Sequence, residues 1–288
     1  MIKDNQTLFN RIHLLVDALI TAVSYMLAWY WKFEGPFAKE DPSIGVLSRE
    51  RYFSFLIYVV PLYIVLYYFF NMYKPKRTLG RRYEIFNILK ANTVGVLLLI
   101  VLLYMISEVD VSRTMLFSFY VINIFLTSLF RFAVRYFLHF FREKGYNLKH
   151  MLLIGYSRAA EEYIKRIQTN PQWGYNVCGV LDDTVPAGTL YKGVKVLGRI
   201  DNIYEILPEN KLDEIAITLS LKDYDRLEEM VAACEKSGVH TKFIPDYNSL
   251  VPSQPYTEDL MGLPVINIRY VPLSNTLNAM AKLAVDII

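Results

Sequence analysis

Four long apolar windows follow one another in the first half of the sequence, and they constrain the fold more than any other feature. The windows cover about residues 12–31, 52–72, 85–107 and 114–138. Each approaches or exceeds the roughly 20 apolar residues that a helix needs to cross the hydrocarbon core of a bilayer. One such window would also suit a buried helix of a soluble protein, but four in succession, with short charged connections, predict a membrane domain of four spans.

The charge distribution predicts how these spans are oriented. Residues 1–145 hold 17 Lys and Arg against 10 Asp and Glu, whereas residues 146–288 hold 14 against 18. The connection at residues 74–82 contains five cations and no acid, and the positive-inside rule assigns such a segment to the cytoplasm. We therefore expect a cytoplasmic N-terminus, two outside loops and a cytoplasmic second half. Nucleic-acid binding is not expected, because the basic residues flank the spans and form no basic stripe in the second half.

Four ionisable residues, Asp17, Lys90, Arg131 and Arg135, fall within the apolar windows. Charge inside a membrane is costly and therefore indicates function by default. In the predicted topology, however, all four lie toward the cytoplasmic side, where they can pair with one another or extend to the interface. A sharper hypothesis is that Arg131 and Arg135 contact a lipid phosphate at the inner leaflet. No span is polar along its length, which disfavours a channel or transporter.

The second half of the chain alternates between apolar strands and amphipathic helices. The helix expected at residues 223–237 has Asp223 as a candidate N-cap and ends at Gly238, which suits a left-handed C-cap. Alternation of this kind predicts a mostly parallel sheet covered on both faces, that is, a Rossmann-like doubly wound domain. The expected strands are 150–155, 177–182, 194–197, 213–218, 239–244 and 263–268, and the other expected helices are 157–169 and 201–207.

The first strand–helix junction of this domain is a candidate nucleotide site. A dinucleotide fingerprint needs three glycines, whereas the series here is Gly155-Tyr-Ser157-Arg158-Ala-Ala160, with only the first in place. The helix N-terminus still offers free N–H groups, and Arg158 adds a donor. Asp182 or Asp183, after the second strand, could meet a ribose hydroxyl. Two interpretations stay open: a nucleotide site formed by these residues, or an ordinary turn glycine and an Asp pair that begins a loop.

The cysteines and histidines indicate no metal site. Cys178 and Cys234 are far apart in apolar segments, with no CxxC motif, and we expect both to be ordinary buried thiols. The four histidines also lack the spacing of metal ligands. Redox chemistry is disfavoured because no Tyr-x-x-x-Lys pair directly follows an expected strand; Tyr191 and Lys195 have this spacing, but Lys195 falls inside the strand expected at 194–197.

After the four predicted spans come four recognisable stretches: Leu152-Leu-Ile-Gly155, Gly174-Tyr-Asn-Val-Cys-Gly-Val-Leu-Asp-Asp183, Gly193-Val-Lys-Val-Leu-Gly198 and residues 271–288. In this order they resemble one family, the bacterial polyisoprenyl-phosphate hexose-1-phosphate transferases, which initiate exopolysaccharide, capsule or O-antigen repeat units. The resemblance implies a bacterial inner-membrane enzyme that moves a sugar phosphate from a UDP-sugar to undecaprenyl phosphate. It also implies Mg²⁺ and an Asp-Glu pair in a C-terminal catalytic domain.

The resemblance also implies how the chain is organised. Residues 1–145 would be the membrane domain, 146–250 the Rossmann-like domain, and 251–288 a linker, a strand and the start of a catalytic-domain helix. Within that helix, expected from about Ser274, Lys282 and Asp286 match the family pattern, although Leu283 replaces the usual Arg. The helix has no stop signal, so we expect the natural protein to continue.

On this interpretation the chain is the membrane-anchoring and regulatory portion of the enzyme. It would carry no catalytic residue, would be inactive alone, and would form a homodimer through its soluble domain.

Two alternatives stay open. The membrane-bound nucleotide-sugar epimerase/dehydratases also place four spans and a Rossmann-like domain ahead of a catalytic domain. The Pro-Leu-Ser-Asn run that leads into a Lys-x-x-x-Asp helix favours the phosphotransferases. The other alternative is a non-enzymatic scaffold or sensor, tethered to the membrane, that binds a nucleotide or a partner protein.

Overall fold

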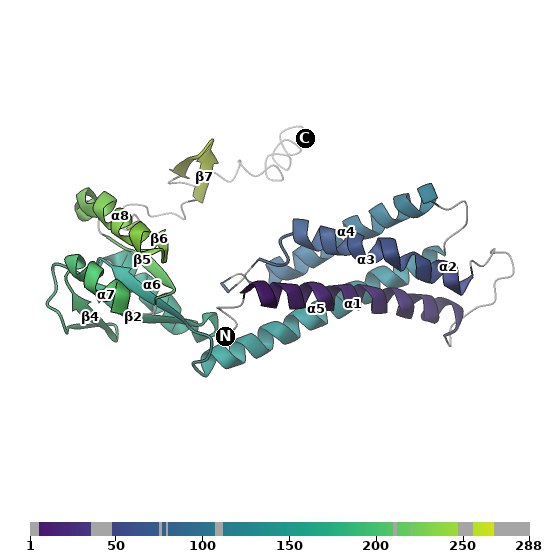
Figure 1. Cartoon of the computed structure of the whole chain (residues 1–288), viewed down its shortest axis with the longest axis horizontal. Helices are drawn as coiled ribbons and strands as arrows, with labels where there is room; N and C mark the ends of the chain where they lie inside the picture. Colours follow the sequence, from purple (N-terminus) through teal and green to yellow (C-terminus); the bar gives the residue numbers. More distant parts are fainter. Residues whose placement is uncertain are drawn as a thin grey trace, which may run out of the picture. The chain divides into compact units, whose positions relative to one another are not determined.

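The protein, analysed as a computed structural model, forms two compact units, shown in Figure 1. One unit comprises residues 1–148 with 171–174, and the other comprises 149–170 with 175–288. The expected linker at 251–256 lies outside the described residues except for Tyr256, which begins a strand, and the expected helix from Ser274 also lies outside them. The structure describes residues 6–35, 48–74, 77–78, 80–106, 112–209, 212–219, 221–246 and 256–267.

The first unit is helical. Four stretches of it are long and apolar enough to cross a membrane, which confirms the predicted spans: Leu8–Phe33, Arg49–Phe69, Arg81–Met105 and Arg113–Glu143. The second stretch is interrupted at Phe55, where one helix ends and the next begins, and the latter continues through Pro61. The helices are α1 (Gln6–Phe33), α2 (Arg49–Ser54), α3 (Leu56–Phe69), α4 (Arg81–Ile106) and α5 (Arg113–Glu143).

Aromatic side chains fill the interior of this unit. Tyr63 of α3 meets Phe119 of α5 edge to face, with ring centroids 5.3 Å apart, and Tyr25 of α1 meets the same ring at 5.5 Å. Gly95 of α4 leaves room for the ring of Tyr63, because a Cβ built at Gly95 would lie 2.8 Å from that ring. Small residues serve the same purpose at many helix contacts in membranes.

The second unit contains a six-stranded sheet with the order β3-β4-β2-β1-β5-β6. All neighbouring strands are parallel except β3 and β4, which form an antiparallel hairpin. The strands are β1 (Lys149–Ile154), β2 (Tyr175–Leu181), β3 (Leu190–Tyr191), β4 (Val194–Gly198), β5 (Glu214–Ile217) and β6 (His240–Phe243). This confirms the predicted fold class, and the parallel strands follow the order of a doubly wound sheet.

Helices cover both faces of the sheet, as its apolar strands require. On one face, Met151 and Leu153 of β1 pack against Ile164 of α6 (Arg158–Thr169). On the other, Leu152 and Ile154 belong to the core formed with α7 (Ile203–Glu209) and α8 (Leu227–Ser237). The alternation of side chains along β1 therefore places its residues in two separate cores.

The structure corrects one sequence expectation and confirms two others. Asp223 is not a helix N-cap, because α8 starts only after the 3₁₀ helix η3 (Leu221–Arg226). The C-cap is confirmed, since Gly238 has φ +68°. The strand expected at 263–268, beyond the Rossmann-like domain, is also confirmed: it is β8 (Leu263–Asn267), which pairs with β7 (Tyr256–Leu260) in a hairpin separate from the six-stranded sheet. The sequence did not predict β7 or the two-residue β3.

Candidate functional site at the carboxyl edge of the sheet

The carboxyl ends of the parallel strands bring the predicted nucleotide-binding residues together. In doubly wound sheets, ligands bind where the strand order reverses, which here is between β1 and β5. Gly155, Ser157 and Arg158 follow β1, and Asp182 and Asp183 follow β2. The five predicted residues thus lie at one edge of the sheet.

Gly155 is required by its conformation and by its surroundings. Its φ is +85°, a value that side chains disfavour. A Cβ built there would lie 2.9 Å from Cα of Leu219, which follows β5. The loops after β1 and β5 therefore approach each other directly, and the hydroxyl of Thr218 donates a 2.6 Å hydrogen bond to the Gly155 carbonyl. Leu219 occupies the space beside the turn.

Ser157 caps helix α6. Its backbone is extended, and its Oγ accepts a hydrogen bond of 3.3 Å from the backbone N–H of Ala160. The Ser157 side chain, at a position where the dinucleotide fingerprint has glycine, is therefore buried as an N-cap. Arg158, the first residue of α6, is exposed.

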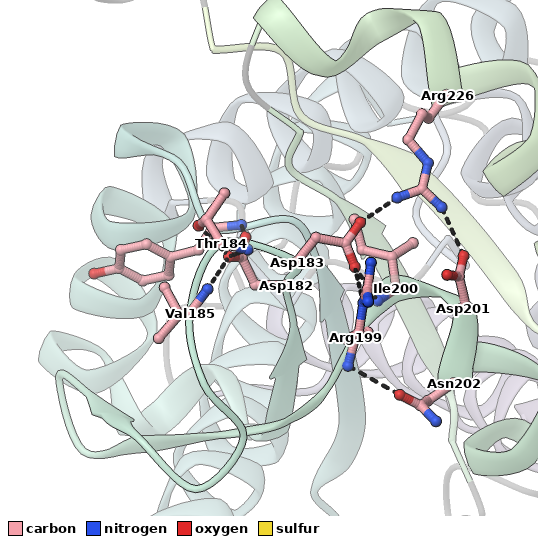
Figure 2. A network of polar contacts seen from close by, with 10 residues as sticks. Asp182, Asp183, Thr184, Val185, Arg199, Ile200, Asp201, Asn202 and Arg226 are labelled. Atoms are coloured by element: carbon pink, nitrogen blue, oxygen red, sulfur yellow. Dashed lines mark hydrogen bonds and ion pairs between the residues drawn. The ribbon is translucent and has the colours of Figure 1, made fainter.

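Asp182 binds the glycine turn with one carboxylate oxygen and its own loop with the other. Oδ2 accepts a hydrogen bond of 2.8 Å from the N–H of Tyr156 in the glycine turn. Oδ1 accepts from the N–H of Thr184 at 2.8 Å, from that of Val185 at 3.1 Å and from the Thr184 hydroxyl at 2.5 Å, as Figure 2 shows for this loop. This carboxylate is 5% exposed and fixes the two loops to each other.

Asp183 lies at the centre of an ion-pair cluster (Figure 2). Its Oδ1 accepts a hydrogen bond of 3.0 Å from the N–H of Ile200, and its Oδ2 pairs with Arg226. Arg226 also donates to Asp201 at 2.7 Å, and Arg199 lies 3.5 Å from Asp183. Partial burial opposes ionisation of Arg226, but its two carboxylate partners raise its pKa. The cluster ties the ends of β2 and β4 to η3.

Tyr156 and Tyr191 lie next to this edge, and their contact was not predicted from the sequence. The rings of Tyr156 and Tyr191 are stacked, with centroids 3.6 Å apart. The Tyr156 hydroxyl donates a 2.5 Å hydrogen bond to Glu161, and burial together with that carboxylate raises the pKa of Tyr156. Tyr191 belongs to β3, a strand too short to leave a periodic signal, so the sequence could not predict this contact.

The two arginines predicted to contact a lipid phosphate lie in the helical unit and have carboxylate partners. Arg131 of α5 pairs with Asp17 of α1 at 2.5 Å, and both are buried. Arg135 pairs with Glu84 of α4, also at 2.5 Å. Lys90, the fourth ionisable residue, lies over the Phe86 ring. Contact with a lipid phosphate stays a prediction.

Within the described ranges, no group of three His, Cys, Asp or Glu side chains is placed to hold a metal ion. The groups that the structure places at the carboxyl edge are hydrogen-bond donors, a helix N-terminus and paired charges.

Comparison with known proteins adds a family and three relatives. A family model described as a CoA-binding domain matches residues 68–245. The chain is 26% identical over 220 residues to a UDP-glucose:undecaprenyl-phosphate glucose-1-phosphate transferase of Klebsiella pneumoniae, covering 76% of this chain and 46% of the relative. Proteins of the same name from Xanthomonas campestris pv. campestris and Escherichia coli (strain K12) are 23% and 24% identical over 141 and 147 residues. These alignments cover 48% and 51% of this chain, and 29% and 31% of the relatives. The chain thus spans less than half the length of each relative.

Proposed function

Because the chain belongs to the polyisoprenyl-phosphate hexose-1-phosphate transferase family, whose CoA-binding domain it carries over residues 68–245, we propose that it anchors and regulates an initiating sugar-phosphate transferase. The reaction would transfer glucose-1-phosphate from UDP-glucose to undecaprenyl phosphate in the bacterial inner membrane. The product would start an exopolysaccharide or capsule repeat unit.

One observation carries this proposal: the Klebsiella relative aligns with 76% of the chain, across both the membrane unit and the soluble unit. The acceptor lipid is confined to the bilayer, whereas a UDP-sugar is dissolved in water. A membrane domain joined to a soluble domain suits an enzyme that must bring such substrates together. The residues that perform the transfer are not assigned to this chain.

A chimera tests the proposal. The chain would replace the corresponding portion of the Klebsiella relative, and membranes containing the chimera would be assayed for UMP release from UDP-glucose with undecaprenyl phosphate. We expect turnover by the chimera, less turnover by the catalytic portion expressed without this chain, and none by the 288-residue chain alone. Turnover by the chain alone, or a chimera no more active than the bare catalytic portion, would contradict the proposal.

The same assay separates the alternatives. A nucleotide-sugar epimerase or dehydratase would change the sugar of the UDP-sugar without releasing UMP, and a scaffold would do neither. The names of all three relatives favour the transferase.

We further propose that the carboxyl edge of the sheet binds a nucleotide that carries phosphate groups, such as coenzyme A or a UDP-sugar. The match to a CoA-binding domain supports this class of ligand. Arg158 is exposed beside the N-terminus of α6, where phosphates bind in other doubly wound domains. Gly155 and Ser157 would shape this loop, and Asp182 and Asp183 would hold the loops around the ligand.

A thermal-shift titration of the full chain in detergent tests this ligand site, with coenzyme A, UDP-glucose and NAD as separate probes. We expect one of them to raise the unfolding midpoint and Arg158→Ala to remove most of that rise. Arg166→Ala is the matched control, because Arg166 is an exposed cation in the last turn of the same helix. A flat response to all three probes, or an unchanged response of the Arg158 variant, would refute the site.

A further inference from the structure

A cysteine, a histidine and an asparagine lie together near the amino ends of β1 and β2, away from the carboxyl edge. His150 and Asn176 are register partners on these neighbouring strands. Sγ of Cys178 lies 3.7 Å from Nδ1 of His150. Cys178 was expected to be buried, but the structure leaves it partly exposed, whereas Cys234 is fully buried in the α8 core.

A β-bulge puts Cys178 in this position. Met151 of β1 pairs with Val177, but the next residue, Leu152, pairs with Gly179. Cys178 is therefore an extra residue in β2, and bulges of this kind redirect side chains and occur often beside functional sites. Gly179 accommodates the irregularity, because a Cβ built there would lie 2.4 Å from Cγ of Leu197.

Two groups lie within reach of Nδ1 of His150: Nδ2 of Asn176 at 3.2 Å and the thiol of Cys178. The thiol also lies 3.9 Å from the backbone carbonyl of Asn176. In the tautomer that carries its proton on Nε2, Nδ1 is an acceptor that can take the thiol proton. An unprotonated ring nitrogen beside a thiol is the arrangement that activates cysteine nucleophiles.

We propose that Cys178 is a reactive thiol that exchanges with low-molecular-weight disulfides, with His150 as its base. In this step Nδ1 takes the thiol proton, and the thiolate attacks one sulfur of the small disulfide. A new S–S bond to Cys178 forms as the old one breaks, and the departing thiolate takes the proton from the imidazolium. The products are a mixed disulfide at Cys178 and one small thiol. This modification site is independent of the proposed transferase and nucleotide functions.

The size of the effect can be bounded. A thiol with an ordinary pKa of about 8.5 is only about 3% ionised at pH 7, so complete ionisation would raise the rate at most about 30-fold. A more acidic thiol is also a weaker nucleophile, which reduces the gain, and we expect His150 to accelerate the exchange about tenfold near pH 7.

The experiment uses the full chain in detergent and a chromogenic aromatic disulfide, which releases a coloured thiol on exchange. Wild type and Cys234→Ala should show one rapidly exchanging thiol, and Cys178→Ser should lack it. His150→Gln should slow the exchange about tenfold near pH 7, because the base that takes the thiol proton is lost. Mass spectrometry should place the adduct on Cys178.

Cys234 provides an internal control, because burial raises the pKa of its thiol and it should react only after unfolding. A His150→Ala variant extends the test, since added imidazole should restore its rate if His150 acts as a base. Reaction of Cys234 with the disulfide would reveal that a His150 variant is unfolded. Imidazole rescue of the His150 variant whose Cys234 stays unreactive then decides the role of His150. A fast phase that survives in Cys178→Ser, wild-type rates in His150→Gln, or no rescue by imidazole would overturn the proposal.

Discussion

At the scale of single residues, two glycines of the soluble unit share a conformation but differ in their surroundings. Gly155 and Gly188 have φ of +85° and +91°. A Cβ at Gly155 would collide with the backbone of Leu219, whereas nothing lies within 4 Å of a Cβ at Gly188. Alanine substitutions at these two glycines therefore separate the stability lost through backbone strain from the stability lost through steric conflict.

Gly155→Ala is expected to destabilise the soluble unit by about 2–4 kcal/mol, because strain and overpacking add. Gly188→Ala should cost only about 1 kcal/mol, for strain alone. Hydrogen exchange of the peptides that cover β1 and β5 measures the difference. Equal protection in the two variants would show that the loops after β1 and β5 do not pack as described.

Glu214 is a second residue whose role depends on its partners. Its Oε2 accepts a hydrogen bond of 2.8 Å from Lys242, and its Oε1 pairs with Lys149. Burial alone would raise the pKa of Glu214, but the two lysines hold it below its ordinary value near 4.5. Burial also opposes the charge of Lys242, yet Glu214 raises the pKa of that lysine.

These shifts give a pH prediction. A carboxylate with a lowered pKa stabilises the fold above its unfolded pKa, and this stabilisation is lost as pH falls through the folded pKa. Lys242, whose pKa is raised, stabilises the fold while it is protonated, and this stabilisation is lost as pH rises through its folded pKa. Glu214→Gln should therefore cost about 2–3 kcal/mol at neutral pH and much less in acid. Thermal unfolding between roughly pH 3 and 7 measures this change.

Glu162→Gln is the matched control, because Glu162 and Arg166 form an exposed pair on α6 with atoms 3.5 Å apart. Exposed pairs contribute little, so this variant should follow wild type at every pH. A Glu214 variant that also followed wild type would contradict the assigned role of the two lysines.

At the scale of elements, the ion pair of Asp17 and Arg131 joins α1 to α5 inside the helical unit. The two side chains are 0% and 5% exposed. Removing one partner leaves the other charge buried, and we expect Asp17→Asn to destabilise the unit by about 3–5 kcal/mol. Thermal unfolding in detergent, followed by the helical circular dichroism signal, measures the loss.

Replacing both partners should cost less than replacing one, because no unpaired charge remains. Asp17→Leu combined with Arg131→Leu should therefore recover much of the stability lost in Asp17→Asn. Glu34→Gln is the control, since Glu34 and Arg49 are exposed and 4.0 Å apart. A double variant no more stable than the single one would show that the pair contributes packing and not charge compensation.

At the scale of the whole molecule, the proposed membrane orientation makes a prediction. With the basic segment at residues 74–82 in the cytoplasm, the connection between α4 and α5 must be outside. Alkaline phosphatase fused after Glu108 should be active, and the same enzyme fused after Thr78 should be inactive. A fluorescent protein that matures only in the cytoplasm should give the opposite pattern. Reversed activities would invert the orientation and place the soluble unit outside.

The features that the sequence determined are encoded locally. Apolar windows of sufficient length predict spans wherever they occur, and alternating strands and helices predict a doubly wound sheet because each element must cover an apolar face. Gly155 was identifiable for the same reason, since a glycine that ends an apolar strand marks a turn. Such signals need only neighbouring residues.

The tertiary structure decided which residues meet. Asp182 follows its strand in the sequence, and the fold brings the N–H of Tyr156 to it from 26 residues away. Arg131 lies in the last predicted span, and the fold places Asp17, 114 residues distant, beside it. Strand order, register and the bulge at Cys178 fix these partners, and they depend on the packing of the whole chain. The sequence therefore located the polar groups, and only the three-dimensional arrangement determined what each one binds.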